Sequence, residues 1–281
     1  MRVARRLRRP VVGLAASLLA ASALGVSGCG GDDGSRTGAS DAGSAEAPTT
    51  KVAGVAETKA LFAGIEQNGL ALGDPQAPVI LTEVVDLQCP FCKAHQLDVQ
   101  PKIVKDLVRT GRVQLHLVPV SFLGEDSQRM EIVLLRFARS QQAWQFTNLV
   151  YWNQGQERSG YATDAWLRQI AAAVPGTKSA TVDELASTTP DAGIAKAAQE
   201  SQAFAQNVIG KAGGGGTPFF AIAAKGQGLD DFTPILSGAD PNSYAHILAA
   251  VEAVEAGRRP KAYRKASGSQ QPSGPPAGGS S

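Results

Sequence analysis

The feature that most constrains the fold is residues 79–92, where an apolar strand pattern runs directly into two closely spaced cysteines. Val79–Val85 reads VILTEVV, which is β-branched and almost wholly apolar, as in a strand covered on both faces. The sequence Cys89-Pro90-Phe91-Cys92 follows it. Pro90 suits the first position of a helix, where an N–H would have no partner. The cysteines are therefore expected at the N-terminus of a helix that leaves a buried strand.

The rest of the chain predicts an α/β domain that a helical block interrupts. A helix from Pro90, which Pro101 should kink or break, leads to a second strand at Val113–Val118. Strand patterns return at 218–223 and 232–236, and a final amphipathic helix starts near Ser243. The block between the two strand regions shows helical periodicity at Met130–Ala138, Gln142–Trp152, Thr163–Ala173, Thr181–Ala186 and Ile194–Val208.

A pair of cysteines at such a junction can bind a metal, form a structural disulfide or act as a redox centre. A zinc site needs four ligands, yet no further cysteine lies in the foldable part, and the three histidines have no ligand spacing. A structural disulfide between Cys89 and Cys92 would close too small a loop to stabilise much. The free N–H groups and the dipole of the helix favour a thiolate at Cys89. Redox chemistry is thus the favoured interpretation, with Cys89 attacking and Cys92 resolving.

Glu83 is an acid within an otherwise apolar strand. Such a carboxylate is costly unless it is exposed, paired or used. Its strand parity can place it beneath the cysteines, where it could accept the proton of Cys92. The alternative is a glutamate that faces solvent at the edge of a sheet. Asp86, nearer the end of the strand, is expected to cap the helix or to form a turn.

A second landmark is the glycine run at 213–216, followed by Thr217-Pro218 at the head of a strand. Pro218 could be an ordinary trans proline of an edge strand. A phosphate-binding loop is disfavoured because no lysine and Ser/Thr follow in the required order, and because the run precedes a strand.

The first 28 residues have the features of a signal peptide. Five arginines precede a short apolar run that ends in small residues. Val26-Ser27-Gly28-Cys29 resembles a lipobox, which predicts lipidation of Cys29; the alternative is an ordinary cleaved signal with an incidental cysteine. The polar stretch after it predicts a flexible tether. Without residues 1–28 the balance becomes 22 basic against 25 acidic residues, so the basic pI gives no argument for nucleic acid.

The C-terminal end is basic and then rich in Gly, Ser and Pro. We expect a solvated tail from residue 258, with contact to anionic lipid or cell-wall polymer as the alternative. The predicted segments are a signal peptide at 1–28, a tether at 29–55, a first α/β part at 56–123, a helical insertion at 124–209, a second α/β part at 210–257 and a disordered tail at 258–281.

Together these residues resemble the DsbA-like branch of the thioredoxin superfamily, in which a helical domain is inserted in a thioredoxin fold. The resemblance rests on Cys89-Pro90-Phe91-Cys92, the helical block and Gly216-Thr217-Pro218. It implies a Cys89–Cys92 disulfide in the oxidised form and Glu83 as the buried acid. It also implies that Pro218 is a cis proline facing the cysteines, with the backbone of Thr217 binding substrate.

The resemblance implies a thiol-disulfide oxidoreductase of exported proteins, without a metal or another cofactor. Donation of disulfides is the favoured direction, served by a membrane redox partner and by a lipid anchor on the outer side of the cytoplasmic membrane. Phe91 replaces the histidine found between the cysteines of strongly oxidising members, and Thr217 is commoner in isomerase or reductase relatives. An envelope reductase or isomerase is therefore one alternative, and a non-catalytic binding or adaptor lipoprotein is another.

Overall fold

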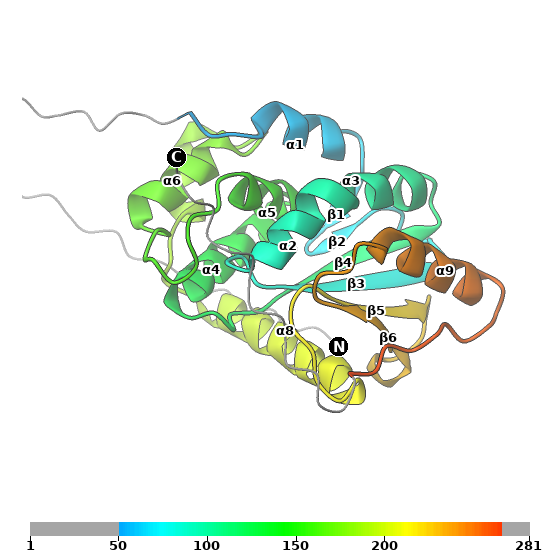
Figure 1. The fold of residues 1–281 in the computed structure, drawn as a ribbon. Coiled ribbons are helices and arrows are strands. Elements are labelled where there is room, and N and C mark those ends of the chain that lie inside the picture. Colours follow the sequence, from blue (N-terminus) through cyan, green and yellow to red (C-terminus); the bar gives the residue numbers. More distant parts are fainter. Residues whose placement is uncertain (1–50, 266–281) are drawn as a thin grey trace, which may run out of the picture. The chain divides into compact units, whose positions relative to one another are not determined.

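A computed structural model describes residues 51–265 of the 281-residue chain (Figure 1). The predicted signal peptide, the lipidation site Cys29, most of the tether and the last part of the tail lie outside these residues. The described part is built on one six-stranded sheet with the order β1-β2-β4-β3-β5-β6. Its strands are β1 (Gln67–Asn68), β2 (Ala71–Leu72), β3 (Val79–Val85), β4 (Val113–Pro119), β5 (Phe219–Ala224) and β6 (Thr233–Ser237).

The strand that precedes the cysteines, β3, lies in the middle of the sheet. It pairs in parallel with β4 and antiparallel with β5, so both of its edges are hydrogen-bonded. The predicted strands are all present. The short hairpin of β1 and β2 was missed, because two-residue strands around Asn68-Gly69 give only a turn signal in the sequence.

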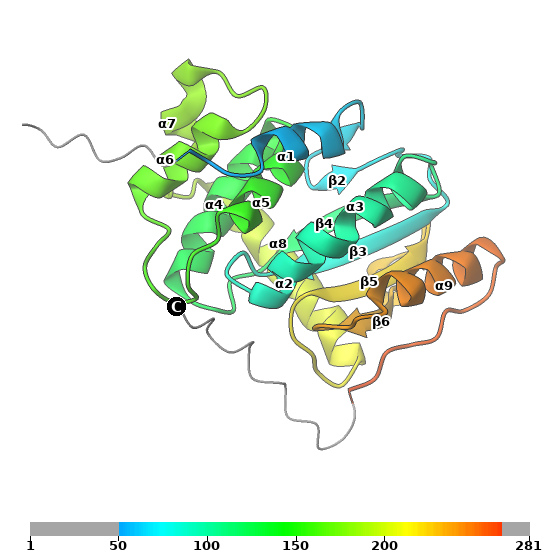
Figure 2. The ribbon, with the colours of Figure 1, turned by 45° about the horizontal axis from the view of Figure 1, so that its top comes forward.

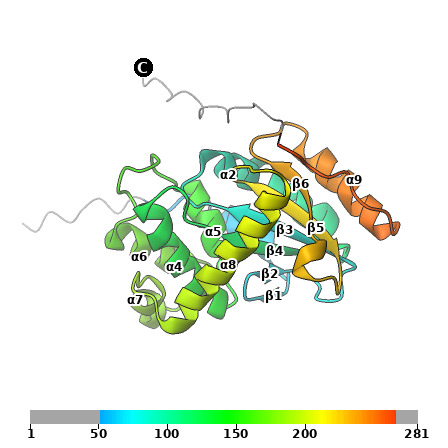
Figure 3. The ribbon, with the colours of Figure 1, turned by 90° about the horizontal axis from the view of Figure 1, so that it is seen from below.

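Alternate residues of β3 face two separate apolar clusters. Leu81 and Val85 belong to the cluster beneath the cysteine helix and α9 (Ser243–Glu255), while Val84 belongs to the cluster beneath α8 (Ala192–Lys211). Figure 2 shows the cysteine helix and α9 on one face of the sheet, and Figure 3 shows α8 crossing the other. This double cover explains why β3 is apolar at nearly every position.

The cysteine helix is continuous but irregular. It consists of α2 (Pro90–Ala94), a π-helical turn η1 (His95–Val99), α3 (Gln100–Ile103) and a second π-helical turn η2 (Val104–Val108). Pro101 was expected to kink or break this helix, and the expectation of a break was wrong. Pro101 has no N–H to donate, and the helix continues through it. In the wider turn before Pro101, the N–H of Gln100 donates to the carbonyl of His95, five residues back.

The segment between β4 and β5 consists of helices joined by turns and loops. Its elements are α4 (Glu125–Arg139), α5 (Ala143–Trp152), α6 (Asp164–Ala173), η3 (Ser179–Thr181), α7 (Val182–Leu185) and α8. Large buried side chains hold the first two together, since the rings of Phe137 and Phe146 stack at 4.8 Å between centroids. The Trp144 indole N–H reaches the carbonyl of Leu70 at 3.1 Å, which ties the helices to the strand region.

The first described residues are already packed, so the tether ends before residue 55. Ala53 exchanges two hydrogen bonds with Asn153, of 2.9 and 3.0 Å. Gly54 has a φ of 79°, and a side chain there would overlap the Trp152 ring. Helix α1 (Val55–Phe62) follows and buries Phe62 against α5 and its surroundings.

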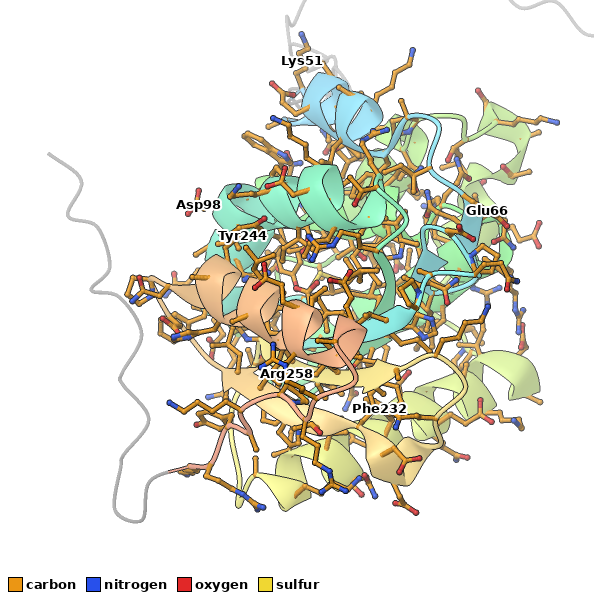
Figure 4. All side chains as sticks on the ribbon, turned by 90° about the vertical axis from the view of Figure 1, so that its right-hand side faces the viewer. Lys51, Glu66, Asp98, Phe232, Tyr244 and Arg258 are labelled. Carbon is orange, nitrogen blue, oxygen red and sulfur yellow. The ribbon has the colours of Figure 1, made fainter. Side chains whose placement is uncertain are left out.

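The expectation of a free tail from residue 258 was also wrong at its start. The backbone N–H of Tyr263 donates to Pro234 of β6 at 2.8 Å, and its ring meets Phe219 edge-on at 6.1 Å. The N–H of Lys265 donates to Ala212. Residues 258–265 thus cover part of the free edge of β6, because an unpaired edge strand offers hydrogen-bonding groups. Figure 4 shows Arg258, where this return begins, below α9 and its residue Tyr244.

Candidate active site

The two cysteines lie where β3 passes into the cysteine helix. Cys89 is the N-cap residue of α2 with an extended backbone, and Pro90 occupies the first turn. The N–H of Cys89 donates to the carbonyl of Asp86 at 2.9 Å, which forms the tight connection between strand and helix. Both cysteines are free thiols, so the pair has its dithiol form. The Cys89–Cys92 disulfide expected in the oxidised form stays a prediction.

The two thiols differ in acidity although they are one helical turn apart. The pKa of Cys89 is lowered to about 7, chiefly by the hydrogen bond from the Cys92 thiol, and further by Thr217 and the N–H groups of Phe91 and Cys92. Burial opposes this but does not prevail. Cys92 is fully buried, and burial together with the neighbouring Cys89 raises its pKa well above that of a free thiol. Cys89 is therefore the thiol that ionises near neutral pH.

Thr217 and Pro218 face the cysteines from the sheet. The Cys89 thiol donates to the carbonyl oxygen of Thr217 at 3.3 Å, and the Thr217–Pro218 peptide bond is cis. The alternative of a trans edge proline is wrong, since β5 lies between β3 and β6. The glycine run before it permits close packing: a side chain at Gly215 would come within 2.7 Å of the Ser237 hydroxyl.

Glu83 is fully buried in β3, so the alternative of a glutamate facing solvent at a sheet edge is wrong. The amide of Gln96 donates to its Oε1 at 3.1 Å, and Oε2 has no hydrogen-bonding partner among the described residues. Burial raises the pKa of Glu83 to about 8, and the bond from Gln96 partly offsets this rise. A carboxyl group with such a pKa can both take up and release a proton near neutral pH.

Asp86 does more than the turn role expected from its position. Its Oδ1 accepts the N–H of Gln88 at 2.9 Å, as in a turn, and also the hydroxyl of Ser127 at 2.6 Å. Its Oδ2 accepts the N–H of Leu123 at 2.9 Å. Burial raises the pKa of Asp86 in spite of these bonds. The end of β3 is thereby fastened to the start of α4, which the sequence did not predict.

Further side chains from the helical segment hold the backbone on either side of the cysteines. Tyr151 donates its hydroxyl to the carbonyl of Asp86 at 3.2 Å, and Gln154 donates to that of Leu87 at 2.9 Å. Gln88 donates to Ser127 at 2.8 Å. Phe122 is 44% exposed, and it precedes Leu123, whose N–H donates to Asp86. The helical segment thus supplies a rigid support for the motif and an exposed apolar side chain in the loop tied to it.

Sequence reasoning missed Gln96 as the partner of Glu83. A signal was present, since Cys92, Gln96 and Gln100 are spaced by four along the cysteine helix and so share one face. All three are fully buried, and an amide on a core-facing stripe is unusual without a purpose.

Neither a metal cluster nor a membrane-spanning helix is found within residues 51–265. No three His, Cys, Asp or Glu side chains come together there in a way that could hold a metal ion. None of the helices in that range is both long and apolar enough to cross a membrane.

With this geometry in view, the chain is assigned to a family. The sequence model of the thioredoxin family matches residues 66–211, more than half of the chain, and the chain belongs to that family. The match includes β3, the cysteine pair and the helical segment up to the end of α8.

Among curated relatives, the similar ones carry the name disulfide bond formation protein D. The protein of Bacillus subtilis is 29% identical over 115 residues, which are 40% of this chain and 52% of that protein. The probable disulfide bond formation protein D of Bacillus cereus is 28% identical over 102 residues, 36% of this chain and 47% of that protein. The chain thus spans about half the length of the curated relatives it matches.

Solved structures confirm the predicted fold class, a thioredoxin fold with an inserted helical segment as in DsbA-like proteins. The oxidised BdbD of Bacillus subtilis has a TM-score of 0.51 and 22% identity, over 68% of this chain and 96% of that one. Chlamydia trachomatis DsbA has a TM-score of 0.53 and 18% identity, over 66% and 91%. At such identities the likeness concerns the fold.

Proposed function

We propose that this protein is a thiol-disulfide oxidoreductase that acts on cysteines of exported proteins, with donation of a disulfide as the favoured direction. The observation that carries the proposal is the unequal acidity of Cys89 and Cys92 at the start of one helix. The exchange needs one sulfur that attacks and leaves as a thiolate, which suits Cys89. It also needs a second thiol that stays protonated until it is used, which suits Cys92. Names of the curated relatives favour the same activity.

In the donating direction, a substrate thiolate attacks Sγ of Cys89 in the oxidised pair. The Cys89–Cys92 bond breaks, a mixed disulfide forms, and Cys92 leaves as a thiolate that takes up a proton. The second thiolate of the substrate then attacks the substrate sulfur of the mixed disulfide, and Cys89 leaves as a thiolate. The substrate is oxidised to a disulfide by two electrons, and the enzyme pair is reduced to the dithiol.

Glu83 is proposed to exchange the proton of Cys92. It lies on the strand that leads to the cysteines, on the face covered by their helix, and its Oε2 has no hydrogen-bonding partner within residues 51–265. A carboxyl with a pKa of about 8 can give a proton to the departing Cys92 and take it back when Cys92 attacks a mixed disulfide.

Thr217 and Pro218 are proposed to bind the substrate backbone beside Cys89. The contact of 3.3 Å between Sγ of Cys89 and the Thr217 carbonyl puts a backbone hydrogen-bonding group next to the reacting sulfur. A peptide laid along residues 216–218 would bring its own cysteine to Cys89. The exposed ring of Phe122 would offer apolar contact on the side of the helical segment.

An envelope reductase is the second candidate, and the acidity of Cys89 favours it. A pKa of about 7 equals the value of about 7 for thioredoxin and lies well above the value of about 3.5 for a strongly oxidising DsbA. Of the two residues between the cysteines, Phe91 offers no polar side chain that could stabilise the thiolate further.

The redox potential of the pair decides between these directions. Reduced and oxidised fractions of the described domain would be measured in glutathione buffers by alkylation of free thiols. A potential above about −180 mV supports donation, whereas one near the value of about −270 mV for thioredoxin would assign the protein to reduction. The Cys89→Ser variant serves as the control without a redox pair.

Partners and location are proposed on the sequence and the relatives. A membrane redox partner would restore the pair after each turnover, and lipidated Cys29 would hold the domain at the outer side of the cytoplasmic membrane. A Cys92→Ala variant should retain clients and the redox partner as mixed disulfides at Cys89, while Cys89→Ala/Cys92→Ala should retain none. Mass spectrometry of the mature N-terminus should find acyl groups on Cys29, and a terminus elsewhere would end that part of the proposal.

A further inference from the structure

A buried polar cluster lies behind the cysteines, and most of its side chains have no part in the exchange steps above. It consists of Glu83 on β3 and of His95, Gln96 and Gln100 on the cysteine helix, all of them buried. Only one of the possible hydrogen bonds among these side chains is formed with good geometry, that from Gln96 to Glu83. Buried polar groups without partners are costly. A cluster that keeps several such groups and forms a single bond therefore calls for a reason.

The π-helical turn η1 brings two neighbouring residues to this cluster. In a regular α-helix, successive side chains point about 100° apart, so that two of them rarely reach the same buried group. The wider turn at His95–Val99 lies just before Pro101, which has no N–H to donate. This turn buries His95 and Gln96 together. Both side chains approach Oε1 of Glu83: Nε2 of Gln96 is 3.1 Å away and Nε2 of His95 is 4.0 Å away.

We propose that Gln96 is a positioning residue of the exchange reaction: it holds Oε1 of Glu83 so that the other carboxyl oxygen can exchange the proton of Cys92. This inference rests on the proposed function and deepens it. Gln96 donates without carrying a charge, so it favours the carboxylate moderately and leaves it able to be protonated. A lysine or arginine in its place would keep Glu83 ionised.

His95 does not compete for this role. Its ring nitrogen lies beyond hydrogen-bonding distance of Glu83, and its ring packs against Phe220 at 4.7 Å between centroids. Burial lowers its pKa to about 4, so the ring is neutral near pH 7. The neutral ring therefore packs beside the carboxyl group without forming an ion pair.

Among residues 51–265, Gln96 is the side chain that hydrogen-bonds Glu83. The residues opposite on the neighbouring strands are Leu117 and Phe220, which do not titrate. The groups that do titrate nearby are Cys89 and Cys92 at the start of the cysteine helix, Asp86 after β3, His95 of η1 and Tyr151 of α5. The pKa of Tyr151 is raised partly by the charge of Glu83. Burial raises the pKa of Glu83 to about 8, and the bond from Gln96 acts against that rise.

The test compares Gln96→Leu with Gln100→Leu in the full-length protein. Gln100 is an equally buried amide one turn further along the same helix, and its side chain interacts with His95 rather than with Glu83, so its replacement is the matched control. A mixed disulfide is first formed between Cys89 and a small aromatic thiol that absorbs on release. The rate at which Cys92 resolves it is then measured across the neutral pH range.

Gln96→Leu should move the pH profile of resolution upward by about one unit. A hydrogen bond to the charged form is lost, and one pKa unit makes resolution about tenfold slower near pH 7. Attack of Cys89 on the aromatic disulfide should keep its rate, and Gln100→Leu should keep the wild-type profile in both steps. The milder Gln96→Met, which is unbranched like Gln, provides the same comparison if the Leu variant does not fold.

A double variant separates positioning from a structural role. In the Glu83→Gln background, Gln96→Leu should slow resolution no further, because there is no carboxyl group left to hold. An unchanged profile in Gln96→Leu, or an equal loss in both backgrounds, would overturn the inference. If wild-type protein formed and resolved no mixed disulfide at all, the proposed function itself would fail, which is a different result.

Discussion

Replacement of Glu83 by Gln should stabilise the reduced protein near neutral pH. The pKa of the buried carboxyl is about 8, against 4.5 for an exposed glutamate. Between these values the folded chain holds a proton that the unfolded chain releases, so the free energy of unfolding falls as pH rises. The fall is about 1.4 kcal/mol per pH unit, and reaches about 3 kcal/mol on going from pH 4.5 to pH 7.

The sign of this effect distinguishes a titrating acid from a simple loss of packing. The contribution of Glu83 to stability is complete below pH 4.5 and is lost as pH rises through 8. Gln is similar in shape and can accept the same bond from Gln96, yet it does not ionise. The variant should thus equal the wild type at low pH and exceed its free energy of unfolding by about 2–3 kcal/mol near pH 7.

Urea unfolding of the reduced chain, followed by tryptophan fluorescence at several pH values between about 5 and 8, measures this directly. Other groups also titrate in the range: Glu131 has a pKa raised to about 7 by burial, and Cys89 one lowered to about 7. These contributions are shared by both proteins and cancel in the difference. Parallel pH dependences of wild type and variant would refute the assigned ionisation of Glu83.

Three further outcomes are expected. The ultraviolet absorbance of the Cys89 thiolate should titrate with a midpoint of about 7, and Cys92→Ala should raise that midpoint, because the Cys92 thiol is the largest cause of the lowered pKa. Truncation after residue 257 should lower the free energy of unfolding by about 1–2 kcal/mol in urea titrations, through loss of the Tyr263 contacts, while truncation after residue 265 should not. Phe137→Ala should cost about 3–5 kcal/mol, seen as a lower thermal midpoint, whereas a replacement at exposed Ser140 should cost little.

Local patterns were enough to predict most of the regular elements. Val79–Val85 has the apolar, β-branched composition of a strand covered on both faces, and it forms that strand with the predicted bounds. The helical block followed from a periodicity of three to four residues. The two-residue strands β1 and β2 were missed, since they are too short to show any alternation.

Boundaries at the two ends of the domain depended on distant contacts. Residues 258–265 look like a solvated tail because they are basic and lead into a Gly-, Ser- and Pro-rich stretch. The contact between Tyr263 and β6 decides otherwise, and it joins residues that lie about thirty apart along the chain. No pattern within the tail itself reports such a partner.

The sequence by itself determined the place of the chemistry. A buried strand followed by Cys89, Pro90 and Cys92 has few ways to end other than at the N-terminus of a helix, and that position makes one thiol acidic. These are effects of neighbouring residues, and a linear sequence contains them.

Only the tertiary structure decided the surroundings that tune that chemistry. The burial of Glu83, its bond with Gln96 across the interior, and the fastening of Asp86 to α4 each depend on how separate elements pack. A pKa responds to burial and to partners in space, and hydrogen bonds between a strand and a later helix leave no mark on either segment alone. Thus the cysteine pair could be found from the local order of residues, while the raised pKa of Glu83 and its bond with Gln96 required the fold.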